Sequence, residues 1–245
     1  MYEWVVAETL VVTSLAAAAA LYFTSQSIKA TNNQLRISEQ GQITERYNAA
    51  IANLGSRSID ILLGGIYALQ RLMEDSPRDQ PTVIAVLCAF VRDRAMSTRK
   101  SQKTLAFPPP TDIQAVLTVV GTRNPANDGP AIVIDLNRTQ LAVGQLEHGN
   151  FTRADLTRAN LTRAILTGAK FSGAYLNDAD LSKADLTGAS LDYAHLTRAD
   201  LTHANLTHAE LTRANLDGAL WPADTAVPEG WVRDTHSGRL KRPGT

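Results

Sequence analysis

The sequence predicts a β-solenoid in the second half of the chain, preceded by a membrane-spanning helix and a small α-helical module. Three observations carry this prediction. An apolar residue returns at every fifth position through Leu136–Trp221, the stretch Thr9–Ile28 has no formal charge, and apolar residues between the two recur at helical spacing. The expected domains are a transmembrane anchor over 1–29, a helical module over 30–97, a linker and capping helix over 98–130, the repeats over 131–222, and a hairpin and tail over 223–245.

The five-residue repeat runs without a slip. Its 18 apolar centres are Leu136, Leu141, Leu146, Phe151, Leu156, Leu161, Leu166, Phe171, Leu176, Leu181, Leu186, Leu191, Leu196, Leu201, Leu206, Leu211, Leu216 and Trp221. From Phe151 onward the residue two positions before each centre is alanine, with Gly149 as the single exception. A period of five fits neither a helix nor a strand, so each unit must combine one short extended step with one corner. Such a short fixed repeat is typical of a solenoid, with the centre and the small residue both pointing inward.

The unit Ala154-Asp155-Leu156-Thr157-Arg158 resembles the repeat of the pentapeptide-repeat family. The resemblance implies an all-β fold, a right-handed quadrilateral β-helix in which four pentapeptides make one square coil. Eighteen units would then give 18/4 = 4.5 coils, and a strand spacing of ~4.8 Å makes a rod roughly 20 Å long. Because no coil can hide its own apolar face, stability should accumulate between neighbouring coils.

The amino-terminal stretch Thr9–Ile28 is 20 residues long and would span ~30 Å as a helix, about one hydrocarbon core. A signal peptide would begin with basic residues, yet the first lysine or arginine is Lys29. We favour a single transmembrane anchor over a cleaved signal or a peripheral helix. Lys29, Arg36 and Arg46 follow the stretch, so the positive-inside rule places the bulk of a single-pass cell-membrane protein in the cytoplasm.

Three amphipathic helices are expected between the anchor and the linker. The first covers Ile43–Leu54 and stops at Gly55-Ser56, the second covers Ser58–Glu74, and the third runs from about Pro81 to Arg94. Gly64-Gly65 inside the second helix cost roughly 1 kcal/mol each against alanine. Their presence indicates close approach of a neighbouring helix.

The segment 41–94 is similar to the region between anchor and repeats in actinobacterial membrane-bound pentapeptide-repeat proteins. The similarity lies in Gln42–Tyr47, Leu63–Leu69 and Asp75–Asp79. It implies a bacterial plasma-membrane protein.

Both ends of the solenoid should be covered, because an open coil exposes its core. After an extended linker over Ser97–Pro110, Thr111-Asp112 should cap a short helix that runs through Val120 and ends at Gly121. This helix is placed to cover the first coil, which should begin at Ile132–Ile134. Beyond Trp221, the segment Gly230–Lys241 has the pattern of a small hairpin that would shield the last edge.

Residues 20 apart should stack in columns if four units make one coil. One column places Asp178 between two arginines, and another is wholly basic once its histidine is protonated. Together they form the candidate partner-binding face: Arg158, Asp178 and Arg198 in the first column, and Arg163, Lys183 and His203 in the second. The alternative is a solvated surface whose mixed charges keep a regular rod soluble.

No motif for catalysis is present. The sequence has no glycine-rich phosphate loop, nucleophile elbow, paired cysteines or His-Glu-x-x-His. Cys88 lies in an apolar run and is expected to be a buried thiol. The five histidines never stack directly over one another, which argues against a metal site. We therefore expect no enzyme, no catalytic residue, no metal and no cofactor.

The favoured function is a membrane-anchored scaffold that binds an unknown protein partner. Self-association into a homo-oligomer is compatible with the sequence, and nucleic acid is not expected as a partner, because 24 basic residues balance 24 acidic ones. The alternative is a DNA mimic that modulates a type II topoisomerase, as some pentapeptide-repeat proteins do. Mimicry needs an acidic rod, whereas Leu136–Trp221 holds nine acidic and eight basic residues, a net charge of −1.

Overall fold

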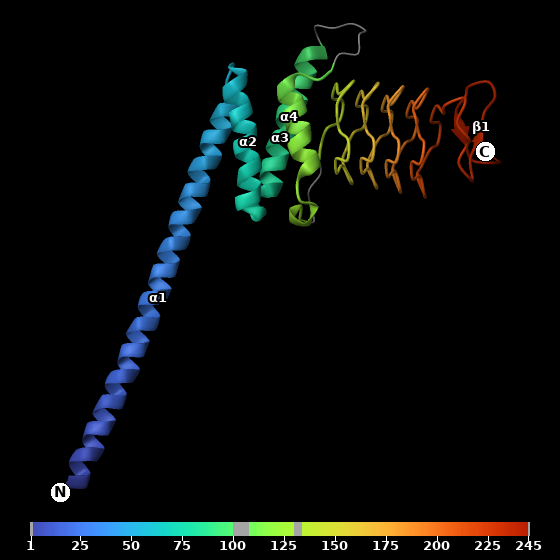
Figure 1. The fold of residues 1–245 in the computed structure, drawn as a ribbon. Coiled ribbons are helices and arrows are strands. Elements are labelled where there is room, and N and C mark those ends of the chain that lie inside the picture. Colours follow the sequence, from blue (N-terminus) through green and yellow to red (C-terminus); the bar gives the residue numbers. More distant parts are fainter. Residues whose placement is uncertain (1, 100–107, 130–133, 245) are drawn as a thin grey trace. The chain divides into compact units, whose positions relative to one another are not determined.

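The computed structural model describes the backbone of residues 2–99, 108–129 and 134–244, and the side chains of 17–95, 108–129 and 134–244 (Figure 1). The chain divides into two compact units, Met1–Asn48 and Ala49–Thr245. The second unit begins within the helical module predicted over 30–97 and also holds the repeats and the hairpin.

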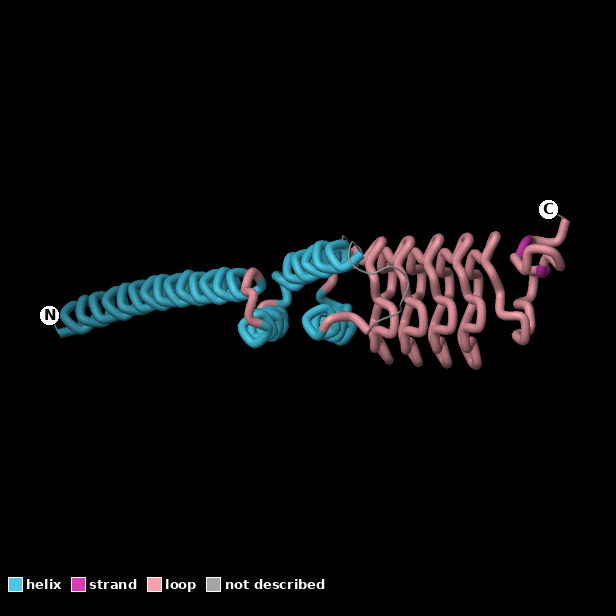
Figure 2. The backbone as a smooth tube through the Cα atoms, turned by 90° about the horizontal axis from the view of Figure 1, so that it is seen from above, coloured by secondary structure: helices cyan, strands magenta, loops and turns pink. Residues whose placement is uncertain are grey.

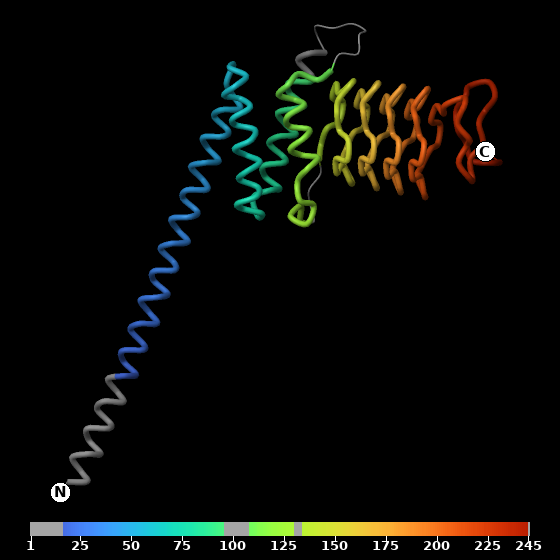
Figure 3. The backbone as a smooth tube through the Cα atoms, viewed as in Figure 1, coloured from blue at the N-terminus to red at the C-terminus, as the bar shows by residue number. Residues whose placement is uncertain are grey.

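Helix α1 spans Tyr2–Leu54 as one continuous element of 53 residues. The part of it that Figure 3 draws in colour has no break. The prediction of a separate helix over Ile43–Leu54 is wrong, because nothing between Lys29 and Ile43 breaks the helical backbone. Gly41, the only glycine in that interval, continues the helix. The helix stops as expected at Gly55, whose N–H donates to the carbonyl of Ala52 at 3.2 Å.

The predicted transmembrane helix is not found in the part of the chain that the structure describes. No helix there is both long enough and apolar enough to cross a membrane. The expected anchor, Thr9–Ile28, begins within residues 1–16, whose side chains lie outside the described ones.

Helices α2 (Ile59–Asp75), α3 (Gln80–Arg99) and α4 (Thr111–Thr122) pack on one another, with two short 3-10 helices, η1 (Pro77–Asp79) and η2 (Pro125–Asn127), at their ends. Their buried apolar side chains form one core: Leu62, Ile66, Leu69, Leu72, Val83, Ile84, Leu87, Val91, Val116 and Val120. Cys88 lies in this core with 1% exposure, and burial raises the pKa of its thiol to about 12. The prediction of an inert, buried cysteine is confirmed.

A close helix contact explains one of the two glycines in α2, Gly65, but not Gly64. A Cβ on Gly65 would lie 2.9 Å from the carbonyl oxygen of Ala50 and 2.9 Å from Cβ of Asn53, so the end of α1 packs against this residue. A Cβ on Gly64 would meet nothing within 4 Å. The predicted close approach is therefore confirmed for Gly65 and wrong for Gly64.

Helix α4 differs from its prediction at both ends. Pro110 occupies the cap position without a side-chain hydrogen bond, and the helix runs through Gly121 to Thr122. Asp112 is 1% exposed and pairs instead with Arg94, at 2.5 Å between Nη2 and Oδ2. The carboxylate predicted to cap α4 thus ties α3 to α4.

The repeats form a quadrilateral β-helix, as predicted. Figure 2 shows its stacked coils from the side. Parallel bridges join residues 20 apart, for example Asp155 to Tyr175 and Tyr175 to His195. The centres and the alanines two positions earlier point inward, and Leu156 and Ala154 are both fully buried. Phe151 and Phe171 stack inside the rod at 5.6 Å between ring centroids. Of the residues expected to begin the first coil, only Ile134 lies within the described residues, and it is buried.

Each corner of the rod uses a left-handed residue two positions after the centre. From Arg138 to Gly218 all 17 of these positions have positive φ, and 13 of them are not glycine. The residue before the centre fixes the corner from its side chain: Oδ1 of Asp155 accepts the N–H of Thr157 at 2.9 Å, and the same bond recurs in many units. Asn and Asp at this position thus stabilise a turn that non-glycine residues adopt at a cost.

Helix α4 covers the first coil, as predicted. The N–H of Asn150 donates to the carbonyl of Gly121 at 2.8 Å. Two hydrogen bonds join Gln114 and Gln145. The Gln145 N–H donates to Oε1 of Gln114 at 3.0 Å, and Nε2 of Gln114 donates to the Gln145 carbonyl at 2.5 Å. A Cβ on Gly121 would lie 3.2 Å from Cα of Gly149, so helix and coil meet backbone to backbone.

The carboxy-terminal hairpin, β1 (Val232–Arg233) and β2 (Leu240–Lys241), covers part of the last coil. Leu240 is buried, donates its N–H to the carbonyl of Ala219 and accepts the N–H of Gly218, both at 2.8 Å. Earlier in the same coil, the N–H groups of Leu206 and Leu211 have no backbone acceptor among the described residues. The predicted shield is confirmed over the final units only.

Candidate functional site

The first predicted column is brought together around the carboxylate of Asp178. Arg198 holds Asp178 with two bonds, Nε to Oδ1 at 2.6 Å and Nη2 to Oδ2 at 2.9 Å. Arg158 approaches the same carboxylate from the preceding coil, at 3.6 Å from Nε to Oδ2. Hydrogen bonding from Arg198, with the charges of both arginines, lowers the pKa of Asp178 below its usual value. Both carboxylate oxygens are therefore engaged inside the column.

The second predicted column is exposed, and its side chains are unpaired in the part of the chain that the structure describes. Arg163, Lys183 and His203 occupy successive corners with φ of 58°, 61° and 59°. Within the described residues none of the three takes part in an ion pair. The nearby carboxylates of Asp180 and Asp200 point into their own corners, where they accept the N–H groups of Ser182 at 3.0 Å and Thr202 at 2.9 Å.

A group of aromatic residues was missed in the sequence. Tyr175 stacks on His195, and the guanidinium of Arg213 lies over the ring of Tyr193. The signal was present in the register, because both pairs are residues 20 apart. The predicted columns were defined by charge alone and therefore did not include these rings.

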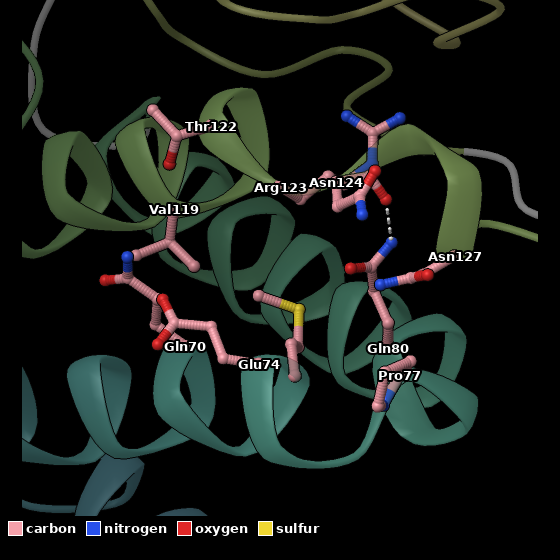
Figure 4. Close-up of a pocket in the computed structure, with 10 residues that line it drawn as sticks. Gln70, Glu74, Pro77, Gln80, Val119, Thr122, Arg123, Asn124 and Asn127 are labelled. Carbon is pink, nitrogen blue, oxygen red and sulfur yellow. Dashed lines mark hydrogen bonds between the residues drawn. The ribbon is translucent and has the colours of Figure 1, made fainter.

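A pocket of about 450 Å³ lies between α2, η1, the start of α3 and the end of α4 (Figure 4). Its buried amide, Gln80, donates from Nε2 to the carbonyl of Asn124 at 2.8 Å and to Oδ1 of Asp128 at 2.7 Å. The buried Arg123 pairs with Asp128 at 2.5 Å and donates to the carbonyl of Asn150 at 2.5 Å. These polar groups join η2, α4 and the first coil through their hydrogen bonds and the ion pair.

No arrangement of reactive groups accompanies this pocket. Among the described residues that line the pocket, Glu74 is the only carboxylate, and none is cysteine or histidine. Across the described part of the chain, no three histidine, cysteine, aspartate or glutamate side chains gather in a way that could hold a metal ion. The rod surface, rather than the pocket, is thus the better candidate for function.

Stacked square coils with a small residue and a large apolar residue in every unit define a pentapeptide solenoid. The family model for pentapeptide repeats matches eight copies over residues 145–178 and 179–218. The chain belongs to the pentapeptide-repeat family, and its β-helix is accordingly of the right-handed quadrilateral type. Proteins of this family are generally non-catalytic.

Solved structures similar to this chain are pentapeptide-repeat proteins. One from Nostoc PCC 7120 is 34% identical, with a TM-score of 0.34, over 38% of this chain and 77% of that one. A protein of the Arabidopsis thaliana thylakoid lumen is 31% identical, with a TM-score of 0.24, over 39% and 66% of the two chains. HetL from Nostoc sp. strain PCC 7120, involved in heterocyst differentiation regulation, is 27% identical, with a TM-score of 0.25, over 39% and 56%.

No curated protein matches this chain. The sequence match to the repeat, rather than these superpositions, carries the family assignment. The membrane-bound actinobacterial subgroup stays a prediction.

Proposed function

We propose that this protein is a non-catalytic scaffold whose rod presents fixed columns of side chains to a protein partner. One observation carries the proposal: the basic column of Arg163, Lys183 and His203 stands on consecutive coils without internal neutralisation. Successive residues of such a column are held about 4.8 Å apart, the strand spacing, by a backbone that is hydrogen-bonded from coil to coil. A surface of this kind selects a partner by electrostatic complementarity.

Charge reversal on the basic column tests the proposal. We expect the double variant Arg163→Glu, Lys183→Glu to lose the partner that the full-length protein recovers from solubilised membranes. The matched control is Lys170→Glu, an exposed lysine on another face of the rod, which should recover the partner unchanged. If the wild-type protein and both variants recover the partner equally, the basic column is not part of the binding site.

The location at the cell membrane also stays a prediction, and it belongs to this proposal. It is supported by the uncharged stretch Thr9–Ile28 and the basic residues after it. Fractionation of cells followed by a high-salt wash tests it, because an inserted helix is retained where a peripheral one is released. Recovery of the whole protein in the wash would contradict the anchor.

The DNA-mimic alternative has less support. The rod is nearly neutral, and its carboxylates are engaged locally, as Asp155, Asp178 and Asp180 show. A DNA mimic needs a continuous row of free anionic groups. A gyrase supercoiling assay with the full-length protein separates the two functions, since stoichiometric inhibition would favour the mimic over the scaffold.

A further inference from the structure

Two tyrosines interrupt the polar surface of the rod. Among its described residues, Tyr175 and Tyr193 are the only large apolar side chains that are exposed, at 46% and 54%. Tyr175 stacks on His195 with 4.7 Å between the ring centroids and 5° between the ring planes. The hydroxyl of Tyr193 accepts a hydrogen bond of 3.0 Å from Nη1 of Arg213, whose guanidinium carbon lies 5.5 Å from the ring centroid. Each ring is therefore held in place by a neighbour on the next coil.

Both pairs flank the same corner of the square coil. Tyr193 lies two residues before His195, the stacking partner of Tyr175. One coil earlier this corner is Gly173, where a Cβ would meet nothing within 4 Å except Cγ of Arg153, at 3.7 Å. The missing side chain leaves room between Arg153, Tyr175 and Tyr193 for a group from outside.

At this corner the carboxylates are hydrogen-bonded, whereas one cation has no partner in the described part of the chain. Both carboxylates beside it are engaged: Asp155 accepts from Thr157 and Asn137, and Asp192 accepts from the Thr212 N–H at 3.0 Å and the Ser190 hydroxyl at 3.2 Å. The guanidinium of Arg153, in contrast, has no acceptor among the described residues.

We propose that this aromatic corner, formed by Arg153, Tyr175, Tyr193, His195 and Arg213, binds an extended acidic segment of a protein partner. A carboxylate of the segment would pair with Arg153 over Gly173, and an apolar side chain would pack on the rings of Tyr175 and Tyr193. Tyrosine and arginine dominate binding energy at protein interfaces, and rings held in advance lose little entropy on binding.

The aromatic corner lies diagonally across the coil from the basic column, because the corners at Arg163 and Gly173 are ten residues, half a coil, apart. The inference rests on the proposed scaffold function and names a chemical class of partner for it.

The register supplies substitutions that the fold accepts. Tyr193→Gly places glycine at a left-handed corner, as at Gly173 and Gly188, and Tyr175→Asn places asparagine before a centre, as at Asn160. The matched control is the double variant His208→Gly, Lys170→Asn, which introduces the same two residues at the same two registers elsewhere on the rod.

The experiment selects peptides from a random display library on the full-length protein and measures their affinity by fluorescence anisotropy. We expect enriched peptides to combine aspartate or glutamate with apolar residues. Their affinity should fall about tenfold or more with the Tyr175→Asn, Tyr193→Gly variant, the loss typical of an aromatic hot spot, and stay unchanged with the control.

Several outcomes overturn the inference. Enrichment of neutral or basic peptides would do so, as would affinity that is insensitive to the tyrosines. Binding of oligothymidylate that depends on the tyrosines would assign the corner to single-stranded nucleic acid, since bases also stack on aromatic rings. If peptides bind but their affinity changes only with the Arg163→Glu, Lys183→Glu variant, the proposed scaffold function is supported and the aromatic corner is not the site. If no peptide is enriched on any of the proteins, both the scaffold function and this inference are overturned.

Discussion

Gly149 shows how a single residue departs from the repeat for a packing reason. Every other unit from Phe151 to Trp221 has alanine at this register. A Cβ on Gly149 would lie 2.5 Å from Cε2 of Phe151 and 3.1 Å from the carbonyl oxygen of Leu146. The residue also meets Gly121 of α4. The alanine found at this register in the other units therefore does not fit at position 149, where α4 covers the first coil.

The substitution Gly149→Ala should destabilise the protein although it matches the consensus. Inserting one methyl group into a packed site typically costs about 1–3 kcal/mol, and here both the Phe151 ring and backbone atoms would have to shift. Urea unfolding followed by circular dichroism measures the change. A higher transition midpoint in the variant would show that the contact between α4 and the coil is looser than described.

Asp234 shapes the turn of the hairpin through its charge. Its Oδ1 accepts the N–H groups of Ser237 at 2.9 Å and His236 at 3.0 Å. These backbone bonds, the Ser237 hydroxyl and the charge of Lys241 lower the pKa of Asp234 to about 2, from 3.8. Because the pKa is depressed in the folded hairpin, the stabilisation is fully present above about pH 4 and is lost as pH falls toward 2.

The pH dependence can be removed by Asp234→Asn. The amide keeps an oxygen that can accept the same N–H groups but does not titrate in this range. We expect the fluorescence of Trp231 in the wild-type protein to change between about pH 4 and 2, and the variant to lose that transition. The same transition in both proteins would assign it to another carboxylate.

At the scale of elements, α2 carries two adjacent glycines with opposite roles. Gly65 packs against the end of α1, whereas Gly64 has open space around its Cα. Both lie inside a helix, where glycine is less favourable than alanine by about 0.5–1 kcal/mol. The same exchange at neighbouring positions therefore separates helix propensity from packing.

Gly64→Ala should raise the free energy of unfolding by about 0.5–1 kcal/mol. Gly65→Ala should lower it by about 1–3 kcal/mol, because the new methyl group would overlap the backbone of Ala50 and the side chain of Asn53. Thermal and urea unfolding of the two variants measure both signs. A gain in both proteins would mean that α1 does not pack on α2 at this point.

The elements also differ in how much of their structure could be predicted from the sequence. The period of five identified the coils and their inward residues, because burial repeats with the same spacing everywhere in the rod. The continuity of α1 could not be predicted from amphipathic pattern, since its middle has no apolar stripe to show that the helix goes on. The role of Asp112 was missed because a helix cap and a buried ion pair use the same residue type, and only the position of Arg94 decides between them.

The aromatic corner could have been found in the sequence, whereas the left-handed corners could not. Tyr175 and His195 are 20 residues apart, so the register alone places them together. The left-handed positions hold arginine, lysine, histidine, aspartate, tyrosine and valine as well as glycine, a mixture that carries no conformational signal. Their conformation follows from the closure of the square coil.

At the scale of the whole molecule, stability of the rod depends on every coil. Leu181 is 1% exposed in a middle coil, while the side chain of Arg158 is 54% exposed at a corner. A charge placed in the core cannot be solvated there, and the coils on either side lose the surface that they bury. An exposed ion pair contributes little in comparison.

Leu181→Asp should therefore unfold the rod, and Arg158→Ala should change stability by no more than about 1 kcal/mol. Circular dichroism and limited proteolysis of both variants measure the outcome. Similar losses of melting temperature would contradict the inward orientation of the centres.

The two end structures fix how the length of the protein can change. Helix α4 meets the first coil at Asn150, and the hairpin meets the last at Gly218 and Ala219, each on particular sides of the square. Removing 20 residues, such as 161–180, shortens the rod yet returns both ends to the same orientation, because bridged residues are 20 apart. Removing a single pentapeptide would rotate the hairpin by a quarter turn relative to α4. Insertions and deletions of whole coils, four pentapeptides each, should therefore be tolerated. If limited proteolysis shows that the protein lacking a single pentapeptide is folded, this expectation is wrong.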